Sequence, residues 1–315
     1  MSLRVSVLDD YQGVAQGFAP WASLGADVEC AFVHEHLDEQ ALLERVADSD
    51  VLVCMRERTP LPRRVLERLP RLRLVVTTGM RNAAIDVTGA RQLGVEVRGT
   101  ESLPSPTAEL TWALIHAVTR RVENEDRAVR AGRWQTRVGD DLTGRTLGVV
   151  GLGRLGSRVA RVAVAFEMSV LAWSPHLTLE RAYPHQARYV PLAELLSASD
   201  IVTIHLVLGE GTRGVIGAGE LARMKPSAWL VNTSRGPVVD ESALLAALRR
   251  RSIAGAALDV YGTEPLPPPH PLLALDNVLL SPHVGYVTHD SYALFYRQAV
   301  EDIATWRQGE VLRVL

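Results

Sequence analysis

Short apolar runs alternate with longer amphipathic stretches along the first hundred residues of this chain. The runs that suit buried strands, rich in Val, Leu and Ile, occupy residues 4–8, 28–33, 51–55, 72–77 and 95–98. Stretches with helical spacing separate them, among them residues 38–47 and 62–69. Because strands that alternate with helices usually build a parallel sheet, the pattern predicts a first α/β unit.

The same alternation resumes further along the chain. A passage with two prolines, residues 102–106, closes the first unit, and a long helix is predicted over residues 107–122. Six further strands are predicted at residues 147–150, 170–173, 201–205, 229–232, 254–260 and 278–280. One more helix, at residues 288–307, is too small to form a domain, so we expect it to fold back onto the first unit.

A glycine motif follows the first of these six strands. Gly151, Gly153 and Gly156 form the sequence G-x-G-x-x-G. The first glycine permits a tight turn, the second lets the backbone approach a pyrophosphate, and the third lets the next helix pack closely. The N-terminus of that helix offers N–H groups to phosphates. With a helical pattern at residues 157–166 and a strand at 169–173, the motif predicts a dinucleotide site.

The expected fold class is therefore α/β, with two Rossmann-like, doubly wound parallel sheets. The second unit is inserted in the first. Residues 1–102 and 285–315 would form a flavodoxin-like substrate domain, and residues 103–284 would form the dinucleotide-binding domain.

Composition and charge exclude several classes of partner. A length of 315 residues fits two domains. The formal net charge is −2 without a basic stripe, so we expect no nucleic-acid partner. No apolar run reaches the roughly 20 residues that span a bilayer, and the N-terminus lacks a signal-peptide pattern, so we expect no membrane association and a cytoplasmic protein. Neither Cys30 and Cys54 nor His34 and His36 have the spacing of a metal site, and none is expected.

Three polar patches each follow a predicted strand of the second unit. They contain Arg235, Glu264 and His283. Ligands of open parallel sheets lie outside the carboxyl ends of the strands, so the patches can face the same crevice as the glycine motif. Arg235 would bind and polarise an α-keto acid. His283 would exchange a proton with the substrate oxygen, and Glu264 would hold the imidazole and favour its charged form.

These patches resemble the signatures of the D-isomer-specific 2-hydroxyacid dehydrogenases, a family with phosphoglycerate, glyoxylate/hydroxypyruvate and D-lactate dehydrogenases. The most specific motifs are residues 144–148, 232–236 and 281–285, and the resemblance extends from about Arg56 to the final helix. The resemblance implies that Arg235, Glu264 and His283 are catalytic. It also implies a substrate domain interrupted by the cofactor domain, and a homodimer held through the cofactor domains.

The resemblance further implies two sets of binding residues. The loop at residues 78–82 would hold the substrate carboxylate with backbone N–H groups. The expected substrate-binding residues are Arg56, Gly79, Met80, Arg81 and Arg235. The expected cofactor-binding residues are Thr107, Gly151, Gly153, Arg154, Leu155, Gly156, Ser174, His205, Leu206, Val207, Thr212, Thr233, Ser234, Arg235, Asp259, His283 and Gly285.

One position departs from the usual pattern of an NAD site. Ser174 stands at the end of the second strand, where an acidic residue usually binds the ribose 2′-hydroxyl of NAD. Without that carboxylate NADP becomes possible. The arginine that usually clamps a 2′-phosphate is also missing nearby, Arg181 being the nearest. NAD is therefore the expected cofactor, with NADP as the alternative.

The leading interpretation is an NAD(P)-dependent oxidoreductase that moves a hydride between nicotinamide and C2 of a small D-2-hydroxy acid or 2-keto acid. An alternative is a dinucleotide-sensing binding protein, similar to a corepressor, without significant turnover. Formate or phosphite oxidation is a third interpretation. The formate branch pairs its histidine with a preceding Gln, whereas Pro282 precedes His283 here.

Overall fold

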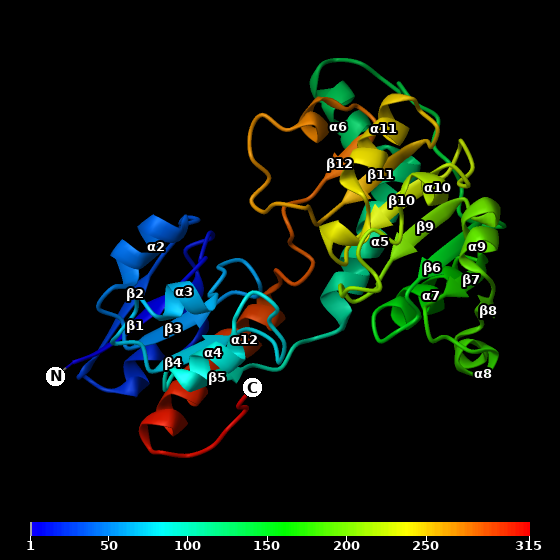
Figure 1. Cartoon of the computed structure of the whole chain (residues 1–315). Helices are drawn as coiled ribbons and strands as arrows, with labels where there is room; N and C mark the ends of the chain where they lie inside the picture. The colour runs from blue at the N-terminus through cyan, green and yellow to red at the C-terminus, as the bar shows by residue number, and fades with distance from the viewer. Residues whose placement is uncertain (1) are drawn as a thin grey trace. The chain divides into compact units, whose positions relative to one another are not determined.

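The computed structural model describes residues 2–315, which divide into two compact units. One unit contains the chain up to Leu103 together with Val287–Leu315, and the other contains Pro104–Tyr286. Each unit is an α/β structure built on its own parallel sheet (Figure 1). The predicted fold class, two parallel-sheet units with one inserted in the chain of the other, is confirmed. The assignment of substrate and dinucleotide roles to the units stays a prediction.

The first unit contains a five-stranded sheet in the order β2-β1-β3-β4-β5. Its strands are β1 (Leu3–Val7), β2 (Val28–Phe32), β3 (Val51–Cys54), β4 (Leu74–Thr77) and β5 (Glu96–Gly99). All four neighbouring pairs are parallel. Every residue of β3 and β4 is buried, which explains why both strands are continuous apolar runs in the sequence. The strand order reverses beside β1, so the switch point of this sheet lies between β1 and β3.

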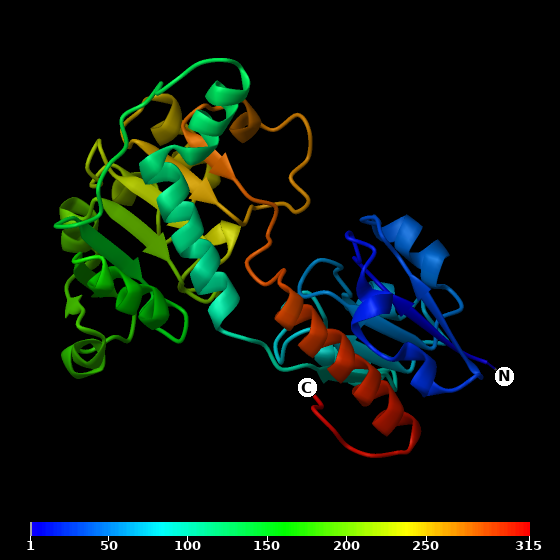
Figure 2. The same cartoon turned by 180° about the vertical axis from the view of Figure 1, so that it is seen from behind.

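Most helices of this unit begin at side-chain caps or prolines. They are α1 (Ala15–Phe18), η1 (Trp21–Leu24), α2 (Glu39–Val46), α3 (Arg63–Leu66), α4 (Val87–Gln92) and α12 (His289–Arg307). Asp38, Asp86 and Thr288 accept hydrogen bonds from backbone N–H groups at the starts of α2, α4 and α12. Figure 2 shows α12 lying along the five-stranded sheet, against which Phe295 and Ile303 are buried.

A buried arginine fastens the C-terminal part of the chain to this unit. Arg98 of β5 is only 1% exposed. Its guanidinium donates to the backbone oxygens of Asp302 and Glu310 and to the Thr305 hydroxyl, at 2.9, 2.5 and 2.8 Å. Such donors must be satisfied when they are buried, so this network accounts for the return of α12 to the first unit.

The second unit contains a seven-stranded sheet in the order β12-β11-β10-β9-β6-β7-β8, and its neighbouring strands are parallel. Its strands are β6 (Thr146–Val150), β7 (Ser169–Trp173), β8 (Arg188–Tyr189), β9 (Ile201–Ile204), β10 (Trp229–Asn232), β11 (Gly255–Leu258) and β12 (Val278–Leu280). The order reverses at β6 and β9, which is the switch point of the dinucleotide-binding fold. The prediction of six strands was wrong by one, because β8 is too short to carry an alternating pattern.

Helices cover both faces of this sheet. They are α5 (Ser105–Arg120), α6 (Val122–Arg130), α7 (Gly156–Ala165), α8 (Leu179–Ala182), η2 (Tyr183–His185), α9 (Leu192–Ala198), α10 (Ala218–Leu221), η3 (Gly236–Val238), α11 (Glu241–Arg249) and η4 (Pro271–Ala274). One apolar core joins α5 and α7 to the strands, and another joins α9, α10 and α11 to them. Figure 2 shows α5 running across its face of the sheet.

The long helix at the start of this unit ends two residues earlier than predicted. We expected a helix over residues 107–122, but α5 ends at Arg120 and α6 begins at Val122. Arg121 between them has a φ of 55°, in the left-handed region. The prediction missed this break because no glycine or proline marks it.

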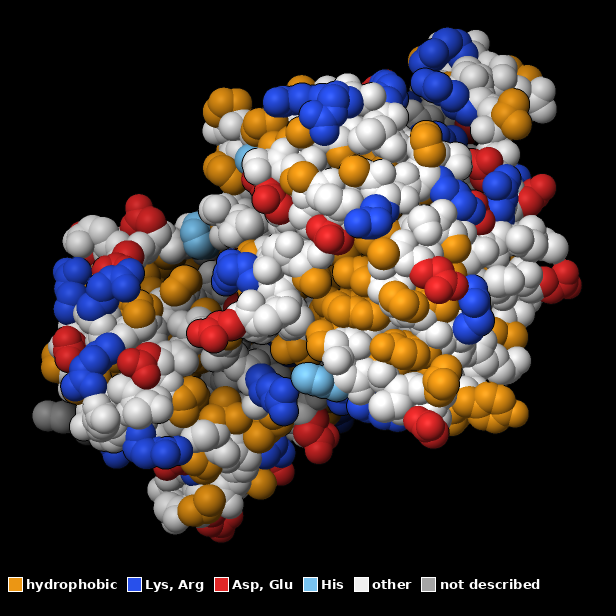
Figure 3. All heavy atoms as spheres, turned by 45° about the vertical axis from the view of Figure 1, so that its right-hand side comes forward, with side chains coloured by type: hydrophobic (Ala, Val, Ile, Leu, Met, Phe, Trp, Pro, Cys, Tyr) orange, Lys and Arg blue, Asp and Glu red, His pale blue; other side chains and the backbone are white. Residues whose placement is uncertain are grey.

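The described surface carries mixed charge. The face shown in Figure 3 has Lys/Arg and Asp/Glu side chains interspersed with apolar ones, in keeping with the formal net charge of −2. Within residues 2–315 no helix has the length and apolarity needed to cross a membrane.

Candidate active site

The three predicted catalytic residues follow three neighbouring strands. Arg235 comes after β10, Glu264 after β11 and His283 after β12. Because these strands are adjacent and parallel, their carboxyl ends lie at the same edge of the sheet. The tertiary structure therefore assembles the three patches at the edge where ligands of this fold bind.

Glu264 and His283 form a close pair. The distance between His283 Nδ1 and Glu264 Oε2 is 2.5 Å, and Glu264 Oε1 accepts a hydrogen bond from the Tyr261 N–H at 2.9 Å. Burial opposes ionisation of Glu264, but the hydrogen bond and positive charge of His283 outweigh it, with a smaller contribution from Arg235. The pKa of Glu264 therefore lies below its usual value. Glu264 is thus held as a carboxylate beside the imidazole of His283.

A buried aspartate shapes the turn that carries the histidine. Asp259 is 1% exposed. Its carboxylate accepts hydrogen bonds from the Ser281 hydroxyl at 2.6 Å and from the N–H groups of Val284 and Gly285 at 2.9 Å each. His283 between these partners has a φ of 53°, a left-handed conformation that is uncommon for histidine. The bonds to Asp259 hold the turn in this conformation and so fix the direction of the imidazole.

The turn of Arg235 is fixed in a similar way. Asn232, at the end of β10, accepts from the Ser234 N–H at 3.0 Å and donates to the Arg235 carbonyl at 3.1 Å. Gly236 lies so close to the next turn that a Cβ there would be 2.1 Å from the Tyr261 carbonyl carbon. The Arg235 turn is therefore packed against the turn that leads to Glu264. The positive charge of Arg235 contributes to lowering the pKa of the Glu264 carboxyl group.

The glycine motif has the predicted steric properties. Gly151 has a φ of 108°, and a Cβ there would lie 2.6 Å from the His205 carbonyl carbon. A Cβ on Gly156 would lie 2.1 Å from the Gly151 oxygen. A Cβ on Gly153, in contrast, would meet no protein atom within 4 Å. The first and third glycines thus serve the turn and the helix packing, while the second borders open space that a phosphate group could approach.

Two further observations at the switch point fit a dinucleotide. His205 follows β9 and pairs through Nε2 with the Thr203 hydroxyl at 2.9 Å. Burial lowers the pKa of His205 to about 4, so the ring is neutral, and among the described residues Nδ1 has no hydrogen-bond partner. A buried ring nitrogen without a partner can accept or donate a ligand hydrogen bond. Together with the space beside Gly153, this supports a cofactor at the β6–β9 edge.

The hydroxyl groups of several other predicted cofactor residues make hydrogen bonds within the loops at the carboxyl edge of this sheet. The Ser234 hydroxyl donates to the Leu206 carbonyl. The Thr107 hydroxyl donates to the Gly285 carbonyl at 3.0 Å, and the Thr233 hydroxyl lies 2.8 Å from that of Thr111. Hydroxyl contacts therefore tie the turns after β9, β10 and β12 to one another or to α5.

Other predicted positions lie on more exposed loops. The Thr212 hydroxyl donates to the Val207 carbonyl at 2.7 Å and so closes a local turn. Arg154 and Leu155 lie in the glycine turn itself. The Ser174 hydroxyl accepts from the Leu152 N–H in that turn, at 2.9 Å. Arg181, the nearest cation, donates to the His176 carbonyl at 3.0 Å.

The predicted substrate loop belongs to the first unit. Gly79 has a φ of 99°, and its N–H donates to the Thr100 hydroxyl at 2.9 Å. The N–H groups of Met80 and Arg81 donate to no other described residue, and both residues are exposed. Arg56 lies over this loop, because a Cβ on Gly79 would be 2.3 Å from its Nη1. The loop thus offers two backbone donors beside a guanidinium.

Sequence reasoning did not identify the positioning roles of several residues. Asn232 and Asp259 support the turns of Arg235 and His283, and Tyr286 packs its ring edge-on to His283 with centroids 5.6 Å apart. Their positions could have indicated these roles in the sequence, because Asn232 and Asp259 lie at the ends of strands and Tyr286 lies three residues after His283. Their partners depend on the order of the strands.

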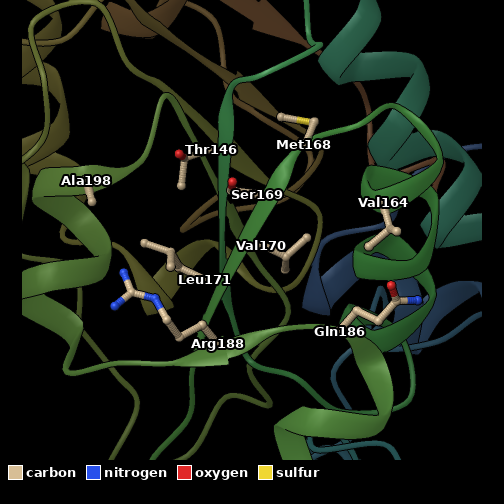
Figure 4. Close-up of a pocket in the computed structure, with 9 residues that line it drawn as sticks. All are labelled: Thr146, Val164, Met168, Ser169, Val170, Leu171, Gln186, Arg188 and Ala198. Carbon is tan, nitrogen blue, oxygen red and sulfur yellow. The ribbon is translucent and has the colours of Figure 1, made fainter.

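A hollow elsewhere on the second unit is not part of this site. Figure 4 shows its lining, which comes from the starts of β6 and β7 and from α7, β8 and α9. Thr146 and Ser169 mark this as the amino edge of the sheet. None of the predicted site residues lines the hollow.

Comparisons with known proteins agree with this geometry. Residues 112–285 match the profile of the D-isomer specific 2-hydroxyacid dehydrogenase, NAD binding domain. A glyoxylate reductase of Korarchaeum cryptofilum is 40% identical over 87% of this chain and 84% of its own length. A D-3-phosphoglycerate dehydrogenase of Archaeoglobus fulgidus is also 40% identical, over 66% of this chain but only 40% of its own length. The chain belongs to the D-isomer specific 2-hydroxyacid dehydrogenase family.

Solved structures support the same assignment. A phosphoglycerate oxidoreductase from Vibrio cholerae superimposes with a TM-score of 0.92 at 34% identity, covering 98% of this chain and all of the other. The protein is thus an NAD(H)-dependent oxidoreductase of the 2-hydroxyacid dehydrogenase class, as the sequence predicted. The comparisons support this interpretation and not that of a binding protein without turnover.

Cofactor preference yields a first prediction. Ser174→Asp should raise the ratio of kcat/KM for NADH to that for NADPH by at least about tenfold, because a carboxylate there would repel a 2′-phosphate. An aspartate could still accept from the Leu152 N–H, so the turn should persist. Ser174→Asn is the matched control, since it has the same shape without the charge. An unchanged ratio in the aspartate variant would show that Ser174 does not lie at the ribose.

Proposed function

We propose that this chain reduces small 2-oxo acids to D-2-hydroxy acids with NADH, using Arg235, Glu264 and His283. The observation that carries the proposal is the 2.5 Å pair of Glu264 and His283 at the same sheet edge as Arg235. A general acid and a polarising cation are the two protein groups that ketone reduction requires.

The bound nicotinamide supplies the hydride that goes to C2 of the substrate. Arg235 presents its planar fork to the carboxylate and keto oxygen and polarises the carbonyl. Because His283 Nδ1 is engaged by Glu264, Nε2 delivers the proton to the oxygen that becomes the hydroxyl. Glu264, kept ionised, stabilises the imidazolium before this transfer. In the reverse direction the neutral imidazole accepts the same proton.

We assign the cofactor to the carboxyl edge of the seven-stranded sheet. The pyrophosphate would lie at Gly153, Arg154 and Leu155, where the backbone borders open space. The remaining predicted contacts divide by position along the edge. Those near the adenosine would be Ser174, His205, Leu206, Val207 and Thr212, and those near the nicotinamide would be Thr107, Thr233, Ser234, Asp259 and Gly285.

The substrate carboxylate is assigned to the loop after β4. The Met80 and Arg81 N–H groups supply donors, and Arg56, beside Gly79, supplies positive charge. Backbone donors next to a guanidinium are a strong combination for a carboxylate.

The names of the relatives indicate which 2-oxo acids to test as substrates. They include glyoxylate reductases and phosphoglycerate dehydrogenases. NADH oxidation with a panel of 2-oxo acids, from glyoxylate to hydroxypyruvate and longer acids, tests the proposal. Turnover of at least one acid to the D-product supports it, whereas NADH binding without turnover of any acid would overturn it.

We place the reaction in the cytoplasm, where the thiols of Cys30 and Cys54 would stay reduced.

We further propose that the enzyme is a homodimer joined through the second unit. Helix α6 and the segment at residues 131–141 carry large exposed apolar side chains. They are Val122, Val129, Trp134 and Val138, which are 58, 51, 77 and 96% exposed. Thr136 ties the segment to α6 through two bonds to Glu125, at 3.0 and 2.7 Å. A set of large exposed apolar groups on one segment is typical of a protein interface.

The dimer is tested by changing this surface. Trp134→Asp combined with Val138→Asp should convert the protein to a monomer in sedimentation equilibrium, because charges at the centre of an apolar interface are costly to bury. Tyr183→Asp is the matched control, since Tyr183 is 84% exposed on η2 of the same unit. A wild-type protein that sediments as a monomer would contradict the proposal.

A further inference from the structure

Residues 313–315 pair with the outer edge of the five-stranded sheet, and we call them the edge segment. The Gly99 N–H of β5 donates to the Arg313 carbonyl at 2.9 Å. The Leu315 N–H donates to the Val97 carbonyl of the same strand, also at 2.9 Å. The end of the chain therefore lies beside β5 (Figure 1). An edge strand carries unpaired backbone groups, and the edge segment satisfies those of β5.

One side chain of the edge segment is anchored to α12. Arg313 Nε donates to Asp302 Oδ1 at 3.0 Å, and its Nη2 donates to Glu301 Oε2 at 2.7 Å. Asp302 is fully buried, and its Oδ2 accepts no hydrogen bond from any other described residue. Burial raises the pKa of Asp302 to about 6, against the charges of Arg313 and Arg98, so the carboxylate is ionised at neutral pH. A buried carboxylate needs a partner, and Arg313 supplies it.

The strand residue that the edge segment holds lies directly behind the predicted substrate loop. A Cβ on Gly99 would be 2.7 Å from the Gly79 carbonyl oxygen and 3.1 Å from the Met80 Cα. The next residue, Thr100, accepts from the Gly79 N–H at 2.9 Å through its hydroxyl. The end of β5 is therefore closely packed against the loop whose Met80 and Arg81 N–H groups we assign to the substrate carboxylate.

Helix α12 holds the same stretch of backbone together with the edge segment. The Glu101 N–H donates to Gln298 Oε1 at 2.7 Å, and the Gln298 carbonyl accepts from Arg313 Nη2 at 3.3 Å. The guanidinium of Arg98 is also bonded to this helix, as described above. Packed interiors transmit displacements, so a change in the edge segment is expected to reach the loop through β5.

We propose that the edge segment positions the substrate loop. Arg313 and Leu315 fix the outer side of β5, and Gly99 on that strand fixes the place of Gly79 and Met80. The inference rests on the proposed function, which assigns this loop to the substrate carboxylate. Two backbone donors bind a carboxylate well only while their spacing and direction are held, and a small displacement is costly. The residues of the edge segment are thus positioning residues, because they act through the loop and do not touch the substrate.

The first test changes the contact between β5 and the loop. Gly99→Ala should raise KM for the 2-oxo acid by about 10–100-fold, the range for lost hydrogen bonds to a charged group, because the added methyl group must displace Gly79 and Met80. The change in kcat should stay below about threefold, as expected when ground-state binding is lost, and the Kd of NADH should not change. Gly17→Ala is the matched control, since a Cβ on Gly17 in α1 would meet no atom within 4 Å.

The second test changes the edge segment itself. Arg313→Met removes the bonds to α12 and should raise KM for the 2-oxo acid by about three- to tenfold, while Arg313→Lys, which keeps the charge, should restore part of the loss. Arg307→Met is the matched control, because Arg307 ties α12 to Asp27 at 2.6 Å and not to β5. Leu315→Pro removes the N–H that bonds to β5 and leaves Arg313 in place. It should raise KM in the same direction even if Arg313→Met folds poorly.

Hydrogen exchange tests the inference without any turnover. The Thr78 N–H donates to the Cys54 carbonyl at 3.0 Å, and the Gly79 N–H donates to the Thr100 hydroxyl at 2.9 Å. Both amides should exchange faster in Arg313→Met and Leu315→Pro than in the wild type, because their protection depends on the position of the loop. In the control Arg307→Met their exchange should match that of the wild type.

The outcomes separate this inference from the proposed function. A lower melting temperature in the edge-segment variants with unchanged KM and unchanged exchange would overturn the positioning role. The same rise in KM in Arg307→Met would also overturn it. If no 2-oxo acid supports NADH oxidation, the proposed function fails instead, and the exchange of Thr78 and Gly79 still decides whether the edge segment positions the loop.

Discussion

Replacing His283 with alanine is expected to lower kcat by about 10²–10⁴-fold while leaving NADH affinity close to that of the wild type. The factor is the usual contribution of a positioned general acid, and the imidazole is the group paired with Glu264 at 2.5 Å. Steady-state kinetics with the best 2-oxo acid, together with fluorescence titration of NADH, would measure both quantities. An undiminished kcat in this variant would exclude His283 as the proton donor.

The chain offers a matched control for this change. His270 also lies beside a carboxylate, with Nε2 3.3 Å from Glu241 Oε1, and its side chain is 14% exposed, as is that of His283. His270→Ala should leave kcat within about threefold of the wild type, because the His270 side chain caps η4 and pairs with Glu241, which is not a predicted site residue. A comparable loss in both variants would point to a general effect on the fold.

The companion change Glu264→Gln tests the electrostatic part of the mechanism. The low pKa of Glu264 means that the carboxylate is ionised at neutral pH and stabilises the imidazolium. Reduction of a keto acid uses the protonated ring, so its rate falls on the alkaline side of the pH profile. Removing the negative charge of Glu264 should move this alkaline fall in the reduction rate to lower pH, which a pH profile of kcat/KM would measure. An unchanged pH profile would show that Glu264 only orients the ring.

The second large effect is expected for Arg235. Arg235→Lys should raise KM and lower kcat, with a combined loss in kcat/KM of about 10²–10³-fold, because an ammonium group cannot reproduce the planar fork toward carboxylate and keto oxygen. The local fold should tolerate the change, since Asn232 holds the turn through the backbone of Ser234 and Arg235. A lysine variant with wild-type kinetics would show that Arg235 does not bind the substrate carboxylate and keto oxygen.

A conservative change elsewhere calibrates this result. Arg223→Lys alters an exposed arginine just beyond α10 in the same unit and should leave both constants unchanged. Inhibition by oxalate, which resembles the carboxylate and keto oxygen of the substrate, should weaken in Arg235→Lys but not in Arg223→Lys. Equal inhibition of the two variants would place the substrate carboxylate away from Arg235.

The sequence by itself determined the fold class and the residues that the proposal uses. Apolar runs of four to six residues marked the buried strands, because parallel strands covered on both faces have few polar positions, as β3, β4, β9 and β10 show. Gly151 and Gly156 were readable because their steric requirements are local. Arg235, Glu264 and His283 were identified because each follows a strand, and parallel strands end at one edge.

Only the tertiary structure decided which of these residues meet and what supports them. The pair of Glu264 and His283 and the three bonds of Asp259 to the His283 turn join loops after different strands. Such contacts depend on the order of strands in a sheet, and a residue's own neighbours in sequence do not encode it. The left-handed break at Arg121 and the two-residue strand β8 were missed for a related reason. Both are held by packing against distant segments, so no local periodicity marks them.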